Sequence, residues 1–271
     1  MGLGNVHIEP TRYGLRSSAS GRSKTRLFSI ALEPAPVEQA AEELARRGIP
    51  HSAPIPYVSV FPPEAETELF HRTAPGTGRE HLWTWLMLGG FLGDRMLARQ
   101  YSTRLFQSAG FSRRIGSLLG GKSAGALMTA MTPVRPFPFF VEWQAFDIAA
   151  ARARAREELD RRDGGPLGVT RMKEIVVGAR DLGAEEARWD RLLSPAPRTA
   201  GGAWELGDGP AIRLVDGDRD GIRSLVWGVA ALDRAQRFLG DEGMLGPTVE
   251  GQVTINTAAV FGLDIRLVES P

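Results

Sequence analysis

Cysteine is absent from the 271 residues, which excludes disulfide bonds, thiolate metal sites and cysteine nucleophiles. Lysine is scarce and occurs only as Lys24, Lys122 and Lys173, so arginine supplies nearly all of the positive charge. The 33 basic and 32 acidic residues leave a net charge of +1. No overall field therefore attracts nucleic acid or an anionic membrane, and we expect neither as a partner.

Long apolar runs are also missing. The most apolar stretch covers residues 82–93, whereas a membrane span needs roughly 20 residues, so we interpret this stretch as a buried element. The opening residues MGLGNVHIEP contain neither the basic region nor the apolar region of a signal peptide. These observations predict a cytoplasmic protein without a membrane span.

The composition that remains is that of a globular protein, with 42% hydrophobic and 24% charged residues. One unit occurs three times: a short apolar strand, a turn and an amphipathic helix. The copies cover residues 27–49, 173–193 and 222–245. Repetition of one supersecondary unit predicts a modular, pseudo-symmetric fold.

Helical spacing in each copy predicts one buried face. Asp181 is placed to cap the helix of the second copy. The predicted inward positions are Val37, Ala40, Ala41 and Leu44 in the first copy, Trp189, Leu192 and Leu193 in the second, and Leu232, Ala235, Phe238 and Leu239 in the third.

Further strands are predicted around these copies. In the C-terminal half they are a hairpin over residues 202–221, with a Gly-Asp-Gly-Pro turn, and two strands at 253–260 and 263–269. In the N-terminal half they are a hairpin over 4–18 and strands at 57–61 and 137–143, with a helical, glycine-rich insertion at 64–135. A charged helix over 147–162, capped by Asp147 and carrying the pairs Glu157–Arg161 and Glu158–Arg162, leads to a glycine-rich boundary at 164–168.

This order of elements, from PFFVEW through GGPLGVTRMKEIVVGARDL and AWELGDGPAIRLV to GLDIRLVE, resembles glyoxalase-like proteins of the vicinal oxygen chelate superfamily. The resemblance covers 137–269 well and 1–61 moderately. It implies an α+β fold of tandem paired βαβββ modules that form two half-open curved sheets. The N-terminal domain, residues 1–163, would lack its first βα unit and carry the insertion 64–135, and the C-terminal domain would span 164–271.

Members of that superfamily bind a small molecule in the sheet cup, many of them with a divalent metal held by histidine and glutamate. The resemblance carries the C-terminal positions onto Glu174, Arg266 and the neighbourhood of Ser224, and the N-terminal position onto Glu142. Only Glu142 matches a metal-ligand position. Since a metal needs three or four convergent donors, the ligand set for a divalent cofactor is incomplete, and the cofactor stays unknown.

Strand alternation singles out two further features of the N-terminal half. Glu142 shares a face with Phe140, where a half-buried carboxylate would have a raised pKa and could act as a general base. The plainer alternative is an edge carboxylate paired with an arginine. His7 lies opposite to Val6 and Ile8 and would point into the N-terminal cup, although most histidines near strands only find a hydrogen-bond partner.

Residues 116–123, GSLLGGKS, match the Walker A pattern for binding phosphates. The preceding residues are polar and do not form the buried strand that such a loop follows, so a loop of the insertion is the alternative.

Three functions therefore stay open. The first is an enzyme with lyase, isomerase or dioxygenase chemistry, with Glu142 as ligand or base and His7 assisting. The second is a non-catalytic protein that binds or sequesters a small molecule, and the third is a nucleotide-binding protein. The oligomeric state is open too, with a homodimer as the arrangement to test. One fold hosts many chemistries, so the order of elements does not decide between these functions.

Overall fold

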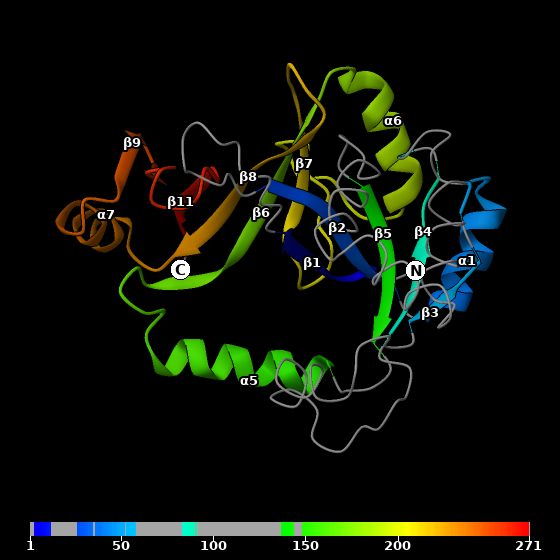
Figure 1. Ribbon diagram of the computed structural model, residues 1–271, viewed down its shortest axis with the longest axis horizontal. Coiled ribbons are helices and arrows are strands. Elements are labelled where there is room, and N and C mark those ends of the chain that lie inside the picture. The colour runs from blue at the N-terminus through cyan, green and yellow to red at the C-terminus, as the bar shows by residue number, and fades with distance from the viewer. Residues whose placement is uncertain are drawn as a thin grey trace, which may run out of the picture. The chain divides into compact units, whose positions relative to one another are not determined.

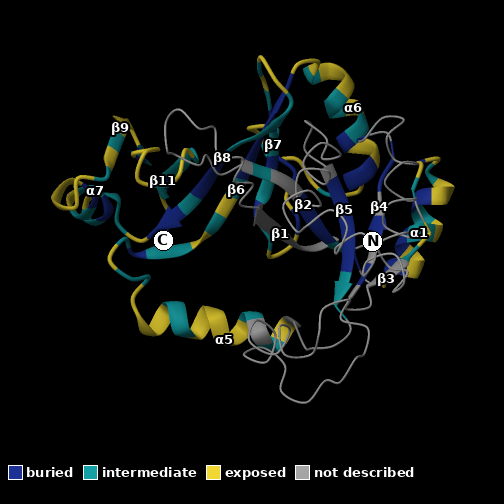
Figure 2. Ribbon diagram, viewed as in Figure 1, coloured by how far each residue is buried: buried dark blue, intermediate teal, exposed yellow. Residues whose placement is uncertain are grey.

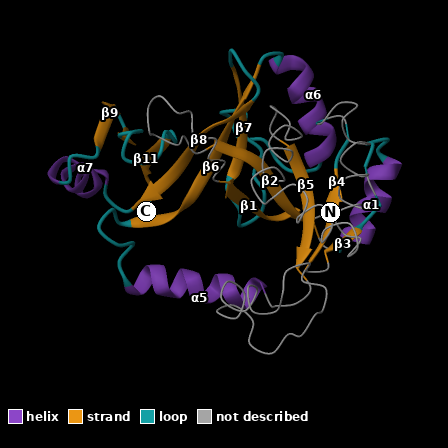
Figure 3. Ribbon diagram, viewed as in Figure 1, coloured by secondary structure: helices purple, strands orange, loops and turns teal. Residues whose placement is uncertain are grey.

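A computed structural model describes residues 3–11, 26–34, 36–51, 53–57, 83–89, 91, 137–143 and 148–270. Within these ranges the chain forms an α+β fold of helices and two open, mixed sheets (Figure 1 and Figure 3). It divides into two compact units, Met1–Leu3 with Ser29–Ala151 and Gly4–Phe28 with Arg152–Pro271. The α+β prediction is confirmed at this level.

The first sheet has the strand order β1-β2-β5-β4-β3. Its strands are β1 (Leu3–Thr11), β2 (Arg26–Pro34), β3 (Ile55–Tyr57), β4 (Trp83–Met87) and β5 (Phe137–Trp143), and helix α1 (Val37–Arg46) follows β2. β2 and β5 run parallel, while β4 is antiparallel to both β5 and β3. The chain from β2 to β5 therefore ends beside the strand where it began.

Apolar side chains fix this arrangement. Val37, Ala40 and Leu44 of α1 are buried, as their spacing predicts, whereas Ala41 is only half-buried. The strand predicted at 137–143 is confirmed to the residue by β5. The apolar run that begins at residue 82 contains β4, whose Leu86 is fully buried opposite Phe140 of β5. A sheet strand thus lies within the predicted insertion.

The second sheet has the strand order β7-β6-β8-β11-β10-β9. Its strands are β6 (Val169–Ala179), β7 (Ala211–Asp216), β8 (Gly221–Val229), β9 (Leu245–Val249), β10 (Gln252–Ile255) and β11 (Ile265–Glu269). Helix α6 (Leu182–Leu193) connects β6 to the segment before β7, and α7 (Leu232–Asp241) connects β8 to β9. β6–β7 and β8–β11 are parallel pairs, and β6 and β8 pair antiparallel at the centre.

The second sheet corrects several details of the predicted strands. The strand expected at 253–260 ends at Ile255, and the edge strand β9 was not predicted. The hairpin expected over 202–221 consists of β7 and one isolated bridge between Trp204 and Ile212. The alternation of apolar residues was correct, but alternation alone does not give the length of a strand.

Helix α5 (Ile148–Arg161) is mostly exposed, as its charged sequence predicts (Figure 2). Glu158 accepts hydrogen bonds from Arg162 Nε at 2.5 Å and from Arg161. The predicted Glu158–Arg162 pair is thus confirmed, while the predicted cap Asp147 lies outside the described residues. None of the helices in the described ranges is both long enough and apolar enough to cross a membrane.

Candidate functional site

The second sheet has two chemically different faces. Helix α7 packs against Ile265 and Leu267 of β11, and the register places Ile265 beside Leu225 of β8. Ile212 of β7 pairs with Trp204, whose ring stacks on Trp189 of α6 at 6.3 Å. The register links Leu225 and Ile212 through Ile175, so both helices cover the same face.

The opposite face carries charge, and we call it the charged face. The side chains of a strand alternate between its two faces, so the register assigns residues to this one. It is formed by Glu174 and Val176 of β6, Arg213 of β7, Ser224 and Val226 of β8, and Asp264 and Arg266 at β11. All three residues predicted for the C-terminal cup, Glu174, Ser224 and Arg266, are brought together here.

Glu174 is held by an arginine from the neighbouring strand. One carboxylate oxygen, Oε1, accepts from Arg213 Nε at 2.9 Å and from Arg213 Nη2 at 2.6 Å. The side chains of Glu174 and Arg213 are only 19% and 33% exposed, so water screens the pair incompletely. The sequence does not single out Arg213, although its place between the buried Ile212 and Leu214 marks it as facing away from the helices.

Arg266 is held by a carboxylate two residues earlier. Arg266 Nη2 donates to Asp264 Oδ2 at 2.8 Å, and Nε lies 3.2 Å from both Asp264 oxygens. Asp264 raises the pKa of the Arg266 guanidinium above its usual value, burial opposes this rise, and the charge of Glu174 adds to it. Glu174 therefore acts on Arg266 electrostatically, while each of the two side chains is bonded to a different partner.

Ser224 is the most deeply buried member of the charged face. It is 1% exposed, and its Oγ has no hydrogen-bond partner among the described residues. The register places it beside Val176, which separates it from Arg213 on the far strand. A buried hydroxyl without a partner costs about 1–3 kcal/mol, so this position is not optimised for stability alone.

The donor set on the charged face does not suit a divalent metal. Within the described ranges, no three histidine, aspartate or glutamate side chains group closely enough to hold a metal ion. The two carboxylates, Glu174 and Asp264, are each already bonded to an arginine. A divalent cation bound to either carboxylate would lie close to a guanidinium group, which like-charge repulsion opposes.

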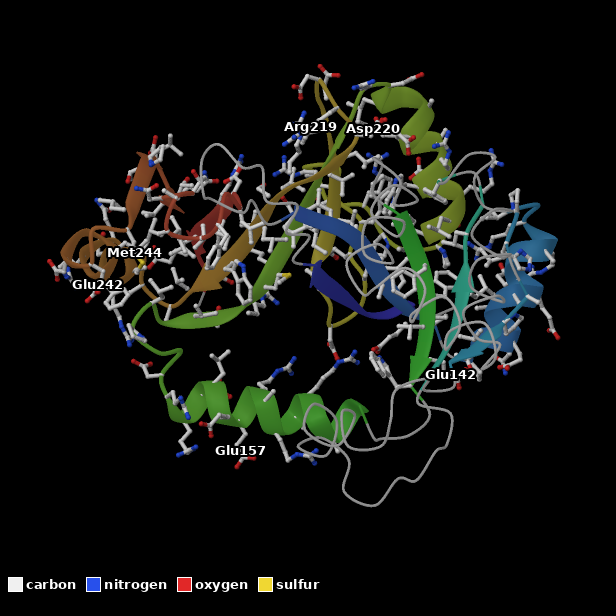
Figure 4. The ribbon with its side chains drawn as sticks, in the orientation of Figure 1. Glu142, Glu157, Arg219, Asp220, Glu242 and Met244 are labelled. Atoms are coloured by element: carbon white, nitrogen blue, oxygen red, sulfur yellow. The ribbon has the colours of Figure 1, made fainter. Side chains whose placement is uncertain are left out.

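In the first sheet, Glu142 lies at the N-terminus of α1 (Figure 4). Its Oε2 accepts a hydrogen bond from the Val37 backbone N–H at 2.9 Å. Pro36, the N-cap residue of α1, makes no side-chain cap hydrogen bond, so a carboxylate from β5 takes over this function. Glu142 thus faces α1. The sequence predicted either a residue of the cup or an edge carboxylate paired with an arginine, and the observed contact with the Val37 N–H is neither of these.

The opposite face of β5 has a carboxylate that the sequence analysis missed. Trp143 Nε1 donates to Glu33 Oε1 of β2 at 2.8 Å. The alternation of Glu33 with the buried Ile30 and Leu32 of β2 was the available signal. Glu33 was overlooked because the strand was recognised only as the start of a strand–helix copy.

Other predicted candidates are placed but not brought together. His7 lies on β1, and its side chain is outside the described part of the structure. His51 Nδ1 lies 2.9 Å from the Ile49 carbonyl oxygen. The Walker A-like segment 116–123 is outside the described residues. The chemical roles proposed for Glu142 and His7 stay predictions.

A second polar cluster lies at the turn between β7 and β8, near Arg219 and Asp220 (Figure 4). Asp220 Oδ1 accepts from the Arg180 backbone N–H at 3.0 Å, and Arg180 Nε donates to the Asp218 carbonyl oxygen at 2.9 Å. Arg223 pairs with the Asp218 carboxylate. These contacts tie the β7–β8 turn to the end of β6, which is a structural role.

Comparisons with known proteins give low similarities. No protein-family model matches the chain, and no curated protein matches it. A hypothetical protein from Staphylococcus aureus has a TM-score of 0.46 at 10% identity, over 91% of this chain and 67% of that one. Methylmalonyl-CoA epimerase from Mycobacterium tuberculosis has a TM-score of 0.34 at 19% identity, over 40% of this chain and 92% of that one.

A variant of the Streptomyces coelicolor methylmalonyl-CoA epimerase, in complex with 2-nitronate-propionyl-CoA, has a TM-score of 0.29 at 16% identity. That match covers 38% of this chain and 98% of the epimerase. Scores this low do not by themselves assign a family or an activity.

Proposed function

We propose that this chain is a small-molecule-binding protein of the vicinal oxygen chelate type, and that its C-terminal sheet binds its ligand without a metal. This is the second of the functions that the sequence left open. Binding alone requires only a complementary surface, whereas the metal-dependent chemistry of the superfamily requires a donor set. The charged face supplies the surface and lacks that donor set.

The strand order supports the assignment of βαβββ modules. Among the described residues, the segments β2-α1-β3-β4-β5 and β8-α7-β9-β10-β11 each begin with a strand and a helix and end with three strands. In both segments the last strand lies parallel to the first, and the other two strands complete an antiparallel edge. The segment from β6 to β7 follows the same path, with isolated bridges at Arg198, Trp204 and Ile212 in place of its two middle strands.

The observation that carries the proposal is the pairing of both carboxylates on the charged face with arginines. Arg213 binds Glu174 and Arg266 binds Asp264, so both carboxylates of the charged face are engaged by guanidinium groups. Guanidinium–carboxylate pairs can exchange partners with a polar ligand, since both members offer hydrogen-bonding atoms in fixed geometry.

Metal analysis combined with a binding screen tests this function. The purified full-length protein, treated with a chelator, should keep its thermal unfolding temperature and contain no stoichiometric metal. Titration with Mn²⁺, Fe²⁺, Zn²⁺ or Ni²⁺ should leave that temperature unchanged, while a screen of small polar molecules should raise it for a subset, because a ligand stabilises the state that binds it. Stoichiometric metal that disappears in Glu174→Ala would overturn the proposal.

A further inference from the structure

We infer that the charged face recognises a small zwitterion, an α-amino acid or a molecule of that charge pattern, with its ammonium group on Glu174 and its carboxylate on Arg266. This inference rests on the proposed function, since it names the ligand class of the same face.

The four charged side chains named on this face alternate in sign, and their charges sum to zero. Arg213 and Glu174 form one pair, and Asp264 and Arg266 form the other. A ligand of a single charge would add an uncompensated charge to these neutral pairs, which is costly in a partly desolvated place. A ligand with one positive and one negative group keeps the sum at zero.

The hydrogen-bonding atoms left over on the two outer residues have the matching polarity. Arg213 binds only Oε1 of Glu174, so Oε2 is available as an acceptor for an ammonium group. Arg266 uses Nε and Nη2 on Asp264, so Nη1 is available as a donor for a carboxylate. In the described part of the chain, one end of the face thus lacks a donor and the other end lacks an acceptor.

The separation of these two residues fits a molecule of this size. The register places Glu174 and Arg266 on either side of Val226, two strand spacings apart. Two spacings amount to about 10 Å between their Cα atoms. An ammonium and a carboxylate carbon about 2.5 Å apart, extended by two hydrogen bonds of about 2.8 Å, span roughly 8 Å, which is comparable with this separation.

Ser224 provides an independent indication of a ligand. Its hydroxyl is buried on the same face without a partner, two residues before Val226, which separates Glu174 from Arg266. A hydroxyl donates one hydrogen bond and accepts others, so it can bind either polar group of a zwitterion. The unpaired Oγ is explained if its partner is supplied by a bound molecule.

Isothermal titration of the full-length protein with L-alanine, propionate and ethylamine tests the inference, because the last two molecules are L-alanine without its amine and without its carboxylate. L-Alanine should bind at least about tenfold more tightly than either single-charge molecule, since it engages both ends of the face. 4-Aminobutyrate, with a longer separation of its charges, should bind less tightly than L-alanine.

Substitutions on the charged face test which residue binds the ammonium group and which binds the carboxylate of the ligand. Glu174→Gln should weaken L-alanine about tenfold and leave propionate unchanged, whereas Arg266→Gln should weaken both. Ser224→Ala should weaken L-alanine several-fold. Glu186→Gln is the matched control, since it breaks an arginine pair of α6, with Arg198, and should leave binding unchanged. Thermal unfolding of each variant shows that it is folded, and Arg266→Lys replaces Arg266→Gln if the latter is not.

The outcomes separate the inference from the function on which it rests. Equal affinity for propionate and L-alanine, with no effect of Glu174→Gln, overturns the zwitterion and leaves metal-independent binding standing. A folded protein that binds none of the probes overturns the zwitterion as well. Binding of L-alanine that disappears with a chelator and returns with a divalent metal overturns the metal-independent function.

Discussion

The first and the second sheet are both mixed, but they place their carboxylates differently. In the first sheet, Glu142 of β5 accepts a hydrogen bond from the Val37 N–H at the N-terminus of α1, although the two residues are 105 positions apart in the sequence. In the second, the cap of α6 is local, since the Asp181 side chain accepts from Ala184 N at 3.0 Å. The sheet carboxylate Glu174 lies on the face opposite to the helices, where it pairs with Arg213 and caps no helix.

This comparison shows that the local cap of a helix decides whether the helix recruits a carboxylate from the sheet. A helix whose N-cap is proline has no side-chain acceptor of its own and recruits one from the sheet. A helix with its own aspartate leaves the strand residues available for other contacts. The resemblance of Glu142 to a ligand position in the sequence is therefore weak evidence until the face of its side chain is known.

The largest expected effect concerns whether β4 belongs to the core of the first sheet. Leu86→Ala should lower the free energy of unfolding by about 2–5 kcal/mol, because Leu86 is fully buried against Phe140. Leu239→Ala in α7 should cost a similar amount in the second unit. Denaturant unfolding measures both, and Val249→Ala at a 59% exposed position is the control, expected within about 0.5 kcal/mol. If Leu86→Ala lowers the free energy of unfolding by less than about 0.5 kcal/mol, β4 is not part of the core.

The next largest effect is expected at the two helix caps, the remote cap Glu142 on α1 and the local cap Asp181 on α6. Glu142→Ala and Asp181→Ala should each cost about 1–2 kcal/mol of unfolding free energy, because each leaves a helix N–H group without its acceptor. Glu142→Gln should retain most of the stability, since its amide oxygen still accepts. If Glu142→Ala unfolds at the same denaturant concentration as the unaltered protein, the cap assignment is wrong. That result would favour the predicted role of Glu142 as a ligand or general base.

A smaller effect of opposite sign is expected on the charged face. Ser224→Ala should raise the free energy of unfolding by roughly 1 kcal/mol, because it removes a buried hydroxyl that has no partner. This gain in stability should accompany the weaker binding of L-alanine, a combination that a purely structural serine does not give. A loss of stability on Ser224→Ala would show that the hydroxyl is satisfied in solution.

The smallest effect lies at the exposed carboxylates. Hydrogen bonds from Arg161 and Arg162 lower the pKa of Glu158, and one from Arg223 lowers the pKa of Asp218. A depressed carboxyl pKa stabilises the folded state above the unfolded-state pKa, and this contribution disappears as the pH falls through the folded-state pKa. Glu158→Gln should therefore lower the unfolding temperature slightly near pH 7, with a difference that vanishes in acid and in high salt. A difference that persists in acid would contradict the assigned pairs.

The sequence predicted more of the fold than of the site. Helical spacing correctly identified Val37, Ala40 and Leu44 as buried, and the strand predicted at 137–143 coincides with β5. Alternation shows which residues share a face, but it does not show which face a helix covers. For that reason Glu142 was expected in the cup, whereas it contacts α1.

The same limit explains the missed partners in the second sheet. Arg213 and Asp264 come close to Glu174 and Arg266 only through strand pairing or a local turn. Pairing between β6 and β7 depends on the crossover through α6, which the sequence indicates only as a succession of elements. Glu174, Ser224 and Arg266 were predicted as cup residues from the family resemblance, and finding the arginine partner of Glu174 and the aspartate partner of Arg266 required the structure.

The remote cap on α1 also has a consequence for biosynthesis. A nascent chain leaves the ribosome N-terminus first, and Val37 emerges 105 residues before Glu142 does. At roughly 5–20 residues per second this interval lasts about 5–20 s, during which the first helix lacks both its acceptor and the strand beneath it. The N-cap contact of α1 is thus completed late in synthesis, whereas α6 carries its own cap from the moment it is translated.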